Sequence, residues 1–238
     1  TLFPYTTLFR SRAQVIISLL LGDNLNTGKI EFGLDGGFNL TNMHGLPQSD
    51  NLRTFNLGFY FDIKTKHPSW MVNTGVIVKS TLGADGLPVY SLNDANLDSS
   101  FSGGKVIRRL NYFNVPVTMK YTFSNHIFLK GGIQLGLKYN AVDEFTNKIV
   151  DSEDLSYKLN IKKQFHPLDV GLTFGAGYRL MGGNGMNLGI QYYLGMVDVM
   201  IDDNSPKQFN RSLYFNVGIP IGKGKAESNA RMRDLLGG

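Results

Sequence analysis

Hydrophobic and polar residues alternate along most of the chain. In Asn187–Met196 (NLGIQYYLGM) every second residue from Leu188 is apolar, and the residues between them are mostly Gly, Asn or Gln. A period of two residues is typical of a β-strand with one apolar and one polar face. The alternation predicts eight strands, at residues 29–40, 53–63, 70–80, 109–123, 126–140, 168–180, 187–200 and 211–221.

The connections between these segments alternate in length. They are short at 64–69, 124–125 and 181–186, and they are long at 81–107 and 141–167. Short turns at one end and long loops at the other are typical of an up-and-down antiparallel meander. Because eight strands are enough to close a sheet on itself, the sequence predicts an all-β, eight-stranded antiparallel barrel.

Two kinds of barrel share this alternation. A soluble, lipocalin-like barrel turns its apolar face inward around a ligand, whereas a transmembrane barrel turns it outward to lipid. A wall that faces water normally carries many Lys and Glu residues, but the polar face here is rich in Gly, Asn and Thr. Its few charges are nearly balanced: Glu31, Asp35, Asp62, Lys79, Lys120, Lys130, Lys138, Asp169 and Arg179.

The volume of the apolar face favours the transmembrane barrel. Its many large side chains would overfill an eight-stranded interior, whereas glycines on the polar face leave room for long side chains in a narrow lumen. Aromatic residues of the apolar face also gather near the short turns, where an interfacial belt is expected. These are Phe61, Trp70, Tyr121, Phe123 and Tyr178.

Two prolines conflict with a closed barrel. Pro116 and Pro220 lie inside predicted strands and lack the backbone N–H that a ladder needs. We therefore expect a bulge or locally widened pairing near each. The alternation also changes phase at Tyr112-Phe113, which predicts a β-bulge where that strand leaves its long loop.

Composition excludes several classes of site and partner. Without cysteine, the chain forms no disulfide, thiolate zinc site or iron–sulfur cluster. The chain has no stretch of 18 consecutive apolar residues, so the sequence predicts no membrane-spanning helix. The net charge is +5, and four of the cations, Lys223, Lys225, Arg231 and Arg233, lie among the last residues of the chain. Because no basic stripe with interleaved aromatics accompanies it, we expect no nucleic-acid partner.

The two ends differ from the barrel segment, which we place at 29–222. TLFPYTTLFRSR at the start resembles the translation of a sequencing adapter, and Ala13 resembles the end of a signal peptide, so we interpret 1–13 as an artefact joined to a signal-peptide remnant. Residues 14–28 form a lead-in that includes the apolar stretch 15–25, for which we consider a short helix at the inner mouth. Residues 223–238 form a polar tail.

Residues with catalytic potential are sparse. None of His44, His67, His126 and His166 has metal-ligand spacing or lies in a known catalytic motif. The best candidate for a rim enzyme is His166 with Asp169 and with Ser152 or Asp154 from the same loop. Gly175–Gly177 and Gly182–Gly185 lack the residues of a phosphate loop, and Asp202–Asn204 lacks most ligands of a calcium loop. We therefore expect no catalytic residue, no cofactor site and no metal site.

Asn111–Phe123 (NYFNVPVTMKYTF) resembles the Tyr-x-x-(Ile/Val)-Pro-(Leu/Val)-x-x-Lys-Tyr segment of the PorT-like outer-membrane β-barrel proteins of Bacteroidetes. The segments IFLKGGIQLGLKYNA, DVGLTFGAGYRL and NLGIQYYLGMVDV resemble the hairpin strands of that family, and KIEFGLDGGFN resembles its first strand. The resemblance covers roughly 14–222, and Pro116 falls where the family also has proline. It implies an eight-stranded outer-membrane barrel, no catalytic residues to carry over, and a founding member linked to a secretion system.

These observations lead to one hypothesis and three alternatives. We predict a monomeric, non-enzymatic protein of the cell outer membrane, surrounded by outer-membrane lipid, with a structural or surface-binding role linked to secretion or envelope biogenesis. Any extracellular or envelope protein partner is expected to bind the loops 81–107 and 141–167. The alternatives are a soluble ligand-binding barrel, a small pore and a rim enzyme. An eight-stranded lumen leaves little free space, which favours a filled lumen over a pore.

Overall fold

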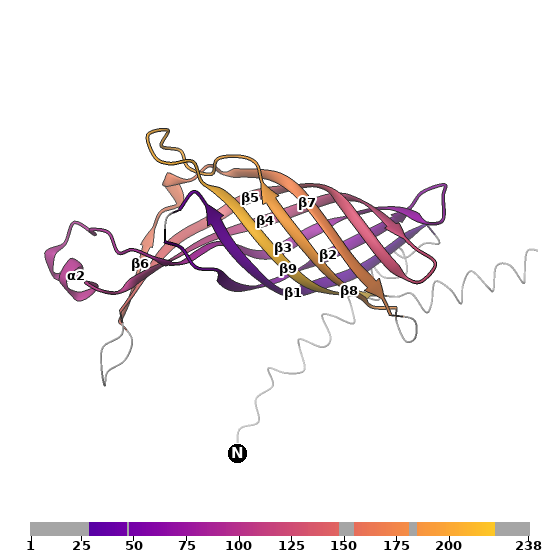
Figure 1. Ribbon diagram of the computed structural model, residues 1–238, viewed down its shortest axis with the longest axis horizontal. Coiled ribbons are helices and arrows are strands. Elements are labelled where there is room, and N and C mark those ends of the chain that lie inside the picture. Colours follow the sequence, from indigo (N-terminus) through magenta and orange to yellow (C-terminus); the bar gives the residue numbers. More distant parts are fainter. Residues whose placement is uncertain (1–28, 47, 148–154, 181–184, 222–238) are drawn as a thin grey trace, which may run out of the picture.

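Eight antiparallel strands close into a ring (Figure 1). The computed structural model describes residues 29–46, 48–147, 155–180 and 185–221, and the order around the ring within them is β1, β2, β3, β4, β5, β7, β8, β9 and back to β1. The predicted eight-stranded barrel is confirmed. Its strands are β1 (Ile30–His44), β2 (Leu52–Lys64), β3 (Trp70–Leu87), β4 (Lys105–Thr122), β5 (Ile127–Asn147), β7 (Leu168–Arg179), β8 (Asn187–Gly195) and β9 (Phe209–Pro220).

Three shorter elements lie within the long connections, at the end of the barrel where these connections are. They are α2 (Ala95–Ser100), β6 (Leu155–Asn160) and the 3-10 helix η1 (Lys162–Gln164). Within the described ranges, no helix has the length and apolar character needed to cross a membrane. The predicted lead-in at 14–28, the artefact at 1–13 and the tail at 223–238 all fall outside the described residues.

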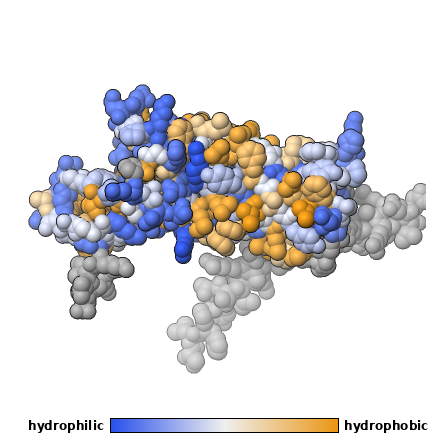
Figure 2. Space-filling model, in the orientation of Figure 1, coloured by the Kyte–Doolittle hydropathy of each residue, from blue (hydrophilic) through white to orange (hydrophobic). Residues whose placement is uncertain are grey.

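The apolar face of the barrel points outward. Leu168, Phe38 and Phe174 are more than half exposed, although they are large and hydrophobic. Figure 2 shows hydrophobic side chains gathered over the barrel wall, and hydrophilic ones toward the end with α2 and β6. A soluble barrel of the lipocalin type needs these apolar side chains inside. That alternative is therefore wrong, and the wall is built to face lipid.

The predicted aromatic belt lies at the end with the short turns. Trp70 and Tyr121 are cross-strand neighbours with ring centroids 5.0 Å apart, and Phe123 packs edge-on against Tyr121 at 4.8 Å. Tyr178 is exposed on the same wall. Amphipathic rings at one level are suited to the boundary between hydrocarbon and head groups.

The structure corrects one of the predicted lumen charges. Lys79 lies on the outer wall, with its Nζ 5.8 Å from the centroid of the Phe55 ring. The register between β3 and β4 shifts between Ile77 and Ser80, so β3 carries one extra residue and its alternation changes phase. Ser80 consequently takes the buried position that parity alone assigned to its neighbour.

The long connections 81–107 and 141–167 were predicted as loops, and this is wrong for much of their length. β3 and β5 continue beyond the barrel wall to Leu87 and Asn147, and β4 begins at Lys105. β6 then pairs with the end of β5, from Val142↔Asn160 to Asn147↔Leu155. We call this projecting end the cap, and define it as residues 81–110, 141–147, 155–167 and 197–208.

The cap has an apolar core. Phe101, Ile161, Phe165 and Val199 from the connections pack against inward side chains of the extended strands and are at most 1% exposed. Those strand residues are Leu82, Ala84, Leu87, Val106, Leu110, Ala141 and Phe145. The cap is thus packed as a water-soluble protein is, with its hydrophobic side chains inside.

Charged side chains cover the outer face of the same strands. Arg109 Nε lies 3.2 Å from Glu144 Oε2, and Lys158 Nζ lies 3.7 Å from the other oxygen of Glu144. Lys105 Nζ pairs with Asp85 at 2.8 Å. The polarity of the wall therefore inverts along β4, from apolar outside in the barrel to charged outside in the cap.

The predicted bulge near Tyr112-Phe113 has a counterpart in the structure, on another strand. The β4–β5 register shifts between Asn111 and Tyr112, but Tyr139 of β5 is the extra residue. β4 itself keeps its alternation of exposed and buried positions there. The phase change in the sequence is the inversion of polarity where β4 leaves the membrane.

The two prolines have different environments. The β3–β4 ladder stops at Thr74↔Val117 and resumes at Ile77↔Asn114, which is the locally widened pairing predicted around Pro116. Thr74 Oγ1 donates to the Pro116 carbonyl at 2.9 Å across this gap. Pro220 shows no register shift, because it is the last residue of β9 and its missing N–H interrupts no ladder.

Glycines on the lumen side leave room, as predicted. A Cβ added at Gly33 would lie 2.3 Å from the Tyr60 ring, so the tyrosine occupies the space that a side chain would take. At Gly132 the nearest atom would be the Val117 carbonyl oxygen, at 2.2 Å. Some glycines therefore accommodate lumen side chains, and others permit a close approach of neighbouring strands.

The β4–β5 turn supplies a first prediction. His126 has φ 68°, a left-handed conformation that disfavours any side chain with a Cβ. We expect His126→Gly to raise the free energy of unfolding by about 0.5 kcal/mol, because the relieved strain of about 1–2 kcal/mol exceeds the added backbone entropy. The urea midpoint of the protein folded in detergent micelles measures the change.

The neighbouring asparagine is the matched control for this turn. Asn125 Oδ1 accepts a hydrogen bond from the Ile127 N–H at 3.2 Å, so Asn125→Gly should lower the urea midpoint. A decrease for both variants would show that the side chain of His126 matters more than its backbone conformation.

Candidate functional site

An ion pair and its hydrogen bonds fill the lumen near the short turns. Lys120 Nζ of β4 lies 2.6 Å from Asp62 Oδ2 of β2, and both side chains are at most 5% exposed. Asn73 Nδ2 donates to the other oxygen of Asp62 at 2.7 Å. Lys120 Nζ also lies 4.4 Å from the centroid of the Phe128 ring. The pair thus links β2 to β4 on the lumen side of β3, the strand between them.

A second ion pair joins two strands that are separated in the ring by β8 and β9. Arg179 of β7 pairs with Glu31 of β1. The Tyr60 hydroxyl donates to Glu31 Oε1 at 3.1 Å, and Asn187 Nδ2 donates to the Tyr60 oxygen at 3.3 Å. These contacts connect β1, β2, β7 and β8 through the lumen.

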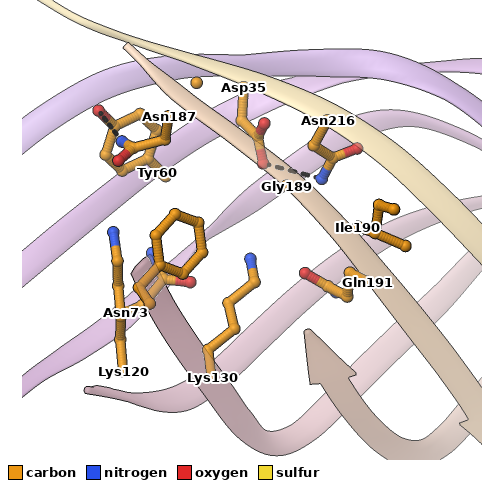
Figure 3. Close-up of a pocket in the computed structure, with 12 residues that line it drawn as sticks. Asp35, Tyr60, Asn73, Lys120, Lys130, Asn187, Gly189, Ile190, Gln191 and Asn216 are labelled. Atoms are coloured by element: carbon orange, nitrogen blue, oxygen red, sulfur yellow. Dashed lines mark hydrogen bonds between the residues drawn. The ribbon is translucent and has the colours of Figure 1, made fainter. Parts of the chain in front are cut away.

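Between these groups is a small polar cavity (Figure 3). Asp35, Lys130, Gln191 and Asn216 help to line it, and Asn216 Nδ2 donates to Asp35 at 3.2 Å. Its volume of about 40 Å³ leaves room for about three waters and for no organic substrate. The filled lumen predicted from the balanced charges agrees with this volume.

The upper lumen is closed by tyrosines and amides. Tyr112, Tyr193 and Tyr214 are at most 1% exposed. Beside them Asp169 Oδ2 accepts a hydrogen bond from Asn210 Nδ2 at 2.7 Å. This layer separates the small cavity below from the apolar core of the cap above.

A buried ion pair holds the cap together. Arg108 of β4 binds Asp143 of β5 with two hydrogen bonds, of 2.9 Å from Nε and 2.7 Å from Nη2. The Tyr90 hydroxyl donates to Asp143 at 2.9 Å, and Arg108 Nη1 donates to Gln208 at 3.4 Å. The Arg108 guanidinium also lies 5.2 Å from the Phe165 ring. One residue pair therefore ties both strands to three connections.

The ionisation of this cluster follows from its burial. Burial raises the pKa of the Tyr90 hydroxyl, and the adjacent Asp143 carboxylate raises it further. The hydroxyl consequently stays a hydrogen-bond donor to Asp143 at physiological pH.

Lys138 fastens the connection after β6 to the barrel mouth. Its Nζ donates to the carbonyls of Lys162, at 2.8 Å, and of Phe165. The lysine was predicted as a lumen charge, and it is 5% exposed. Its role is to cap the end of η1 rather than to line a channel.

The structure does not assemble the rim enzyme considered from the sequence. The His166 side chain is exposed, whereas Asp169 is 1% exposed inside the lumen, so the two side chains face different environments. Ser152 and Asp154 lie outside the described residues. In the part of the chain that is described, no three His, Cys, Asp or Glu residues are grouped as metal ligands.

Other motifs have structural explanations. Asp202 accepts hydrogen bonds from the Asn204 N–H at 3.0 Å and the Ser205 hydroxyl at 2.9 Å, and these bonds lower the pKa of Asp202. Its carboxylate thus closes a turn. Gly175–Gly177 lies within β7, where it makes strand pairs with β5 and β8.

The Arg108–Asp143 cluster was missed in the sequence because Asp143 lay in a predicted loop. The signal that could have found it is the continued alternation of Val106, Arg108 and Leu110 in one segment and of Ala141, Asp143 and Phe145 in the other. A charge at the centre of each apolar triplet is typical of a buried pair.

Known proteins resemble this chain in sequence or in fold. A family model described as the outer membrane protein beta-barrel domain matches residues 13–200. Ail, the attachment invasion locus protein of Yersinia pestis, is 13% identical, with a TM-score of 0.42 over 81% of this chain and 99% of that chain. Its complex with the heparin analogue sucrose octasulfate gives a TM-score of 0.41 at the same identity and coverage.

Neisserial surface protein A is 9% identical, with a TM-score of 0.37 over 80% of this chain and 96% of that chain. No curated protein sequence matches the chain at a significant level.

Proposed function

The chain belongs to the outer membrane protein beta-barrel domain family and lies in the outer membrane, and from that premise we propose that it is a non-enzymatic protein that binds an extracellular or envelope protein through its cap. Outer-membrane barrels have short periplasmic turns and longer extracellular connections. The cap, which the long connections form, therefore faces the exterior.

The observation that carries this proposal is the contrast between cap and lumen. The lumen holds a cavity of about 40 Å³, which is too small for transport, whereas the cap has its own apolar core and buried ion pair. Such a folded cap holds a binding surface in one conformation and so lowers the entropy lost on association.

β6 supplies a specific place for a partner. Within the described chain it pairs only with β5, so its other edge is open to a further strand. Tyr157 and Lys158 of β6 are exposed. An extended segment of a partner protein adds to such an edge through main-chain hydrogen bonds.

The finer form of the proposal is a role beside the secretion or envelope-biogenesis machinery. The PorT-like segment Asn111–Phe123, with Pro116 inside a barrel strand, supports that assignment. Because the ring closes within one chain, we propose that the protein acts as a monomer.

Site-specific photocrosslinking in intact cells tests the proposal. With a photoreactive amino acid at Tyr157, we expect one discrete protein adduct whose partner is an envelope or extracellular protein. The control position is Leu135, which is exposed on the lipid-facing wall and should give no protein adduct. Absence of a Tyr157 adduct, or a steady conductance in planar bilayers, would contradict a cap-mediated binding role.

A further inference from the structure

Three cations point outward from the barrel near its extracellular end. Arg53 is the second residue of β2, Arg211 is the third residue of β9, and Lys79 lies on the outer wall of β3 because of the bulge described above. Arg53 is the cross-strand partner of Leu40, which pairs on its other side with Leu213. The three cations therefore lie along one arc of the wall, formed by β9, β1, β2 and β3.

None of these three cations forms an ion pair with a carboxylate of the described residues. The ion pairs within the described ranges use Lys105, Arg108, Arg109, Lys120, Lys158 and Arg179. Arg211 Nη1 donates only to backbone carbonyls, including that of Asn210 at 3.0 Å. Lys79 lies over the Phe55 ring. Their positive charge is thus available to an anion from outside the protein.

A groove accompanies the arc on its β1–β9 side. It has a volume of about 470 Å³, with Leu40, Tyr192 and Leu213 as its apolar part. Arg211 and His44 line it toward the extracellular end. Polar groups from the end of β1 and from the connection to β2 complete that end: Asn42 Nδ2 donates to Asn51 at 3.3 Å, and Ser49 donates to Asn42 at 3.1 Å.

The position of the arc explains why unpaired cations are tolerated on a lipid-facing wall. A charged side chain is costly at the centre of the bilayer, and the cost falls almost to zero near the interfaces. Arg53 and Arg211 are near the strand ends, beside polar groups of the loop and above apolar side chains of the wall. An anionic lipid matches this arrangement, because its charged head group lies above its apolar acyl chains.

We propose that this arc binds the phosphorylated head group of an anionic lipid of the outer leaflet. Arg53, Lys79 and Arg211 supply the positive charge, and guanidinium groups are especially suited to phosphate oxygens. An acyl chain of the same lipid lies against Leu40 and Tyr192 in the groove. This site is on the barrel wall and is separate from the open edge of β6 that serves the proposed protein partner.

Lipid binding by the full chain in nanodiscs tests the proposal. The probe is bis-phosphorylated lipid A in a background of zwitterionic phosphatidylcholine, with bound lipid counted by native mass spectrometry. Because each cation near an anionic surface contributes about a fivefold change in affinity, Arg53→Ala and Arg211→Ala should each weaken binding about fivefold. The double variant should weaken it about 25-fold.

Matched controls separate this site from general charge effects. Lys66→Ala removes an exposed lysine from the β2–β3 turn, at the opposite end of the barrel, and should leave lipid A binding unchanged. Arg211→Lys should retain part of the affinity, dephosphorylated lipid A should bind no better to the parent than to the double variant, and excess inorganic phosphate should not displace the lipid. Folding of each variant is verified by its heat-dependent mobility in SDS gels.

Equal lipid A binding by the parent and the folded double variant would overturn the proposal. Equal binding of phosphorylated and dephosphorylated lipid A would also overturn it.

Discussion

Replacing Arg108 with alanine is expected to unfold the cap, at a cost of about 3–5 kcal/mol, while the barrel ring stays closed. The change leaves the fully buried carboxylate of Asp143 without its cation. It also removes the donor to Gln208 and the group that packs on the Phe165 ring. The three connections that meet at the pair should therefore lose their attachment together.

Limited trypsin digestion in detergent micelles measures this effect. The parent cap should resist cleavage, and the Arg108→Ala cap should be cut rapidly while heat-dependent SDS mobility reports an intact barrel. Arg109→Ala is the matched control, because its pair with Glu144 is partly exposed and contributes at most about 1 kcal/mol. Equal protease resistance of the Arg108 variant and the parent would show that the apolar core alone holds the cap.

Replacing Lys120 with methionine is expected to destabilise the whole barrel by about 3–5 kcal/mol. Asp62 would keep its hydrogen bond from Asn73 but would lose the ammonium group 2.6 Å away, in a lumen where water has little access. Because the pair links β2 to β4 over the intervening strand β3, the loss should lower the urea midpoint of global unfolding in micelles.

A double variant distinguishes a lost ion pair from a packing defect. Lys120→Met combined with Asp62→Leu removes both charges, so it should recover most of the stability that the single variant loses. Lys105→Met is the control, since Lys105 also pairs with an aspartate but is half exposed, and its loss should cost at most about 1 kcal/mol. If the double variant were no more stable than Lys120→Met, packing rather than unpaired charge would dominate.

The alternation of the sequence predicted the ring because every barrel strand separates lipid from lumen by residue parity. Parity failed where a strand has an extra residue. The bulge in β3 places Lys79 outside, and Tyr139 of β5 shifts the pairing with β4. An extra residue leaves the composition of a segment almost unchanged, so its position depends on pairing with neighbours that the sequence does not specify.

The cap was missed for a different reason. In β4 the residues Val106 and Leu110 are buried and Arg109 faces water, whereas lower in the strand Val117 faces lipid and Thr118 is buried. Both arrangements alternate, and the pattern alone does not say which solvent surrounds the wall. The prediction was therefore correct for the parts of the strands in the bilayer. It assigned their continuation in water to loops.

The inversion of polarity along β4 also fixes how deep the protein sits. If the barrel sank toward the periplasm, Arg109 would enter hydrocarbon; if it rose, Val117 would move toward water. Both displacements raise the free energy, so the barrel has one favoured depth in the bilayer. In a bilayer of different thickness, the lipids next to the barrel should therefore stretch or thin before the protein slides.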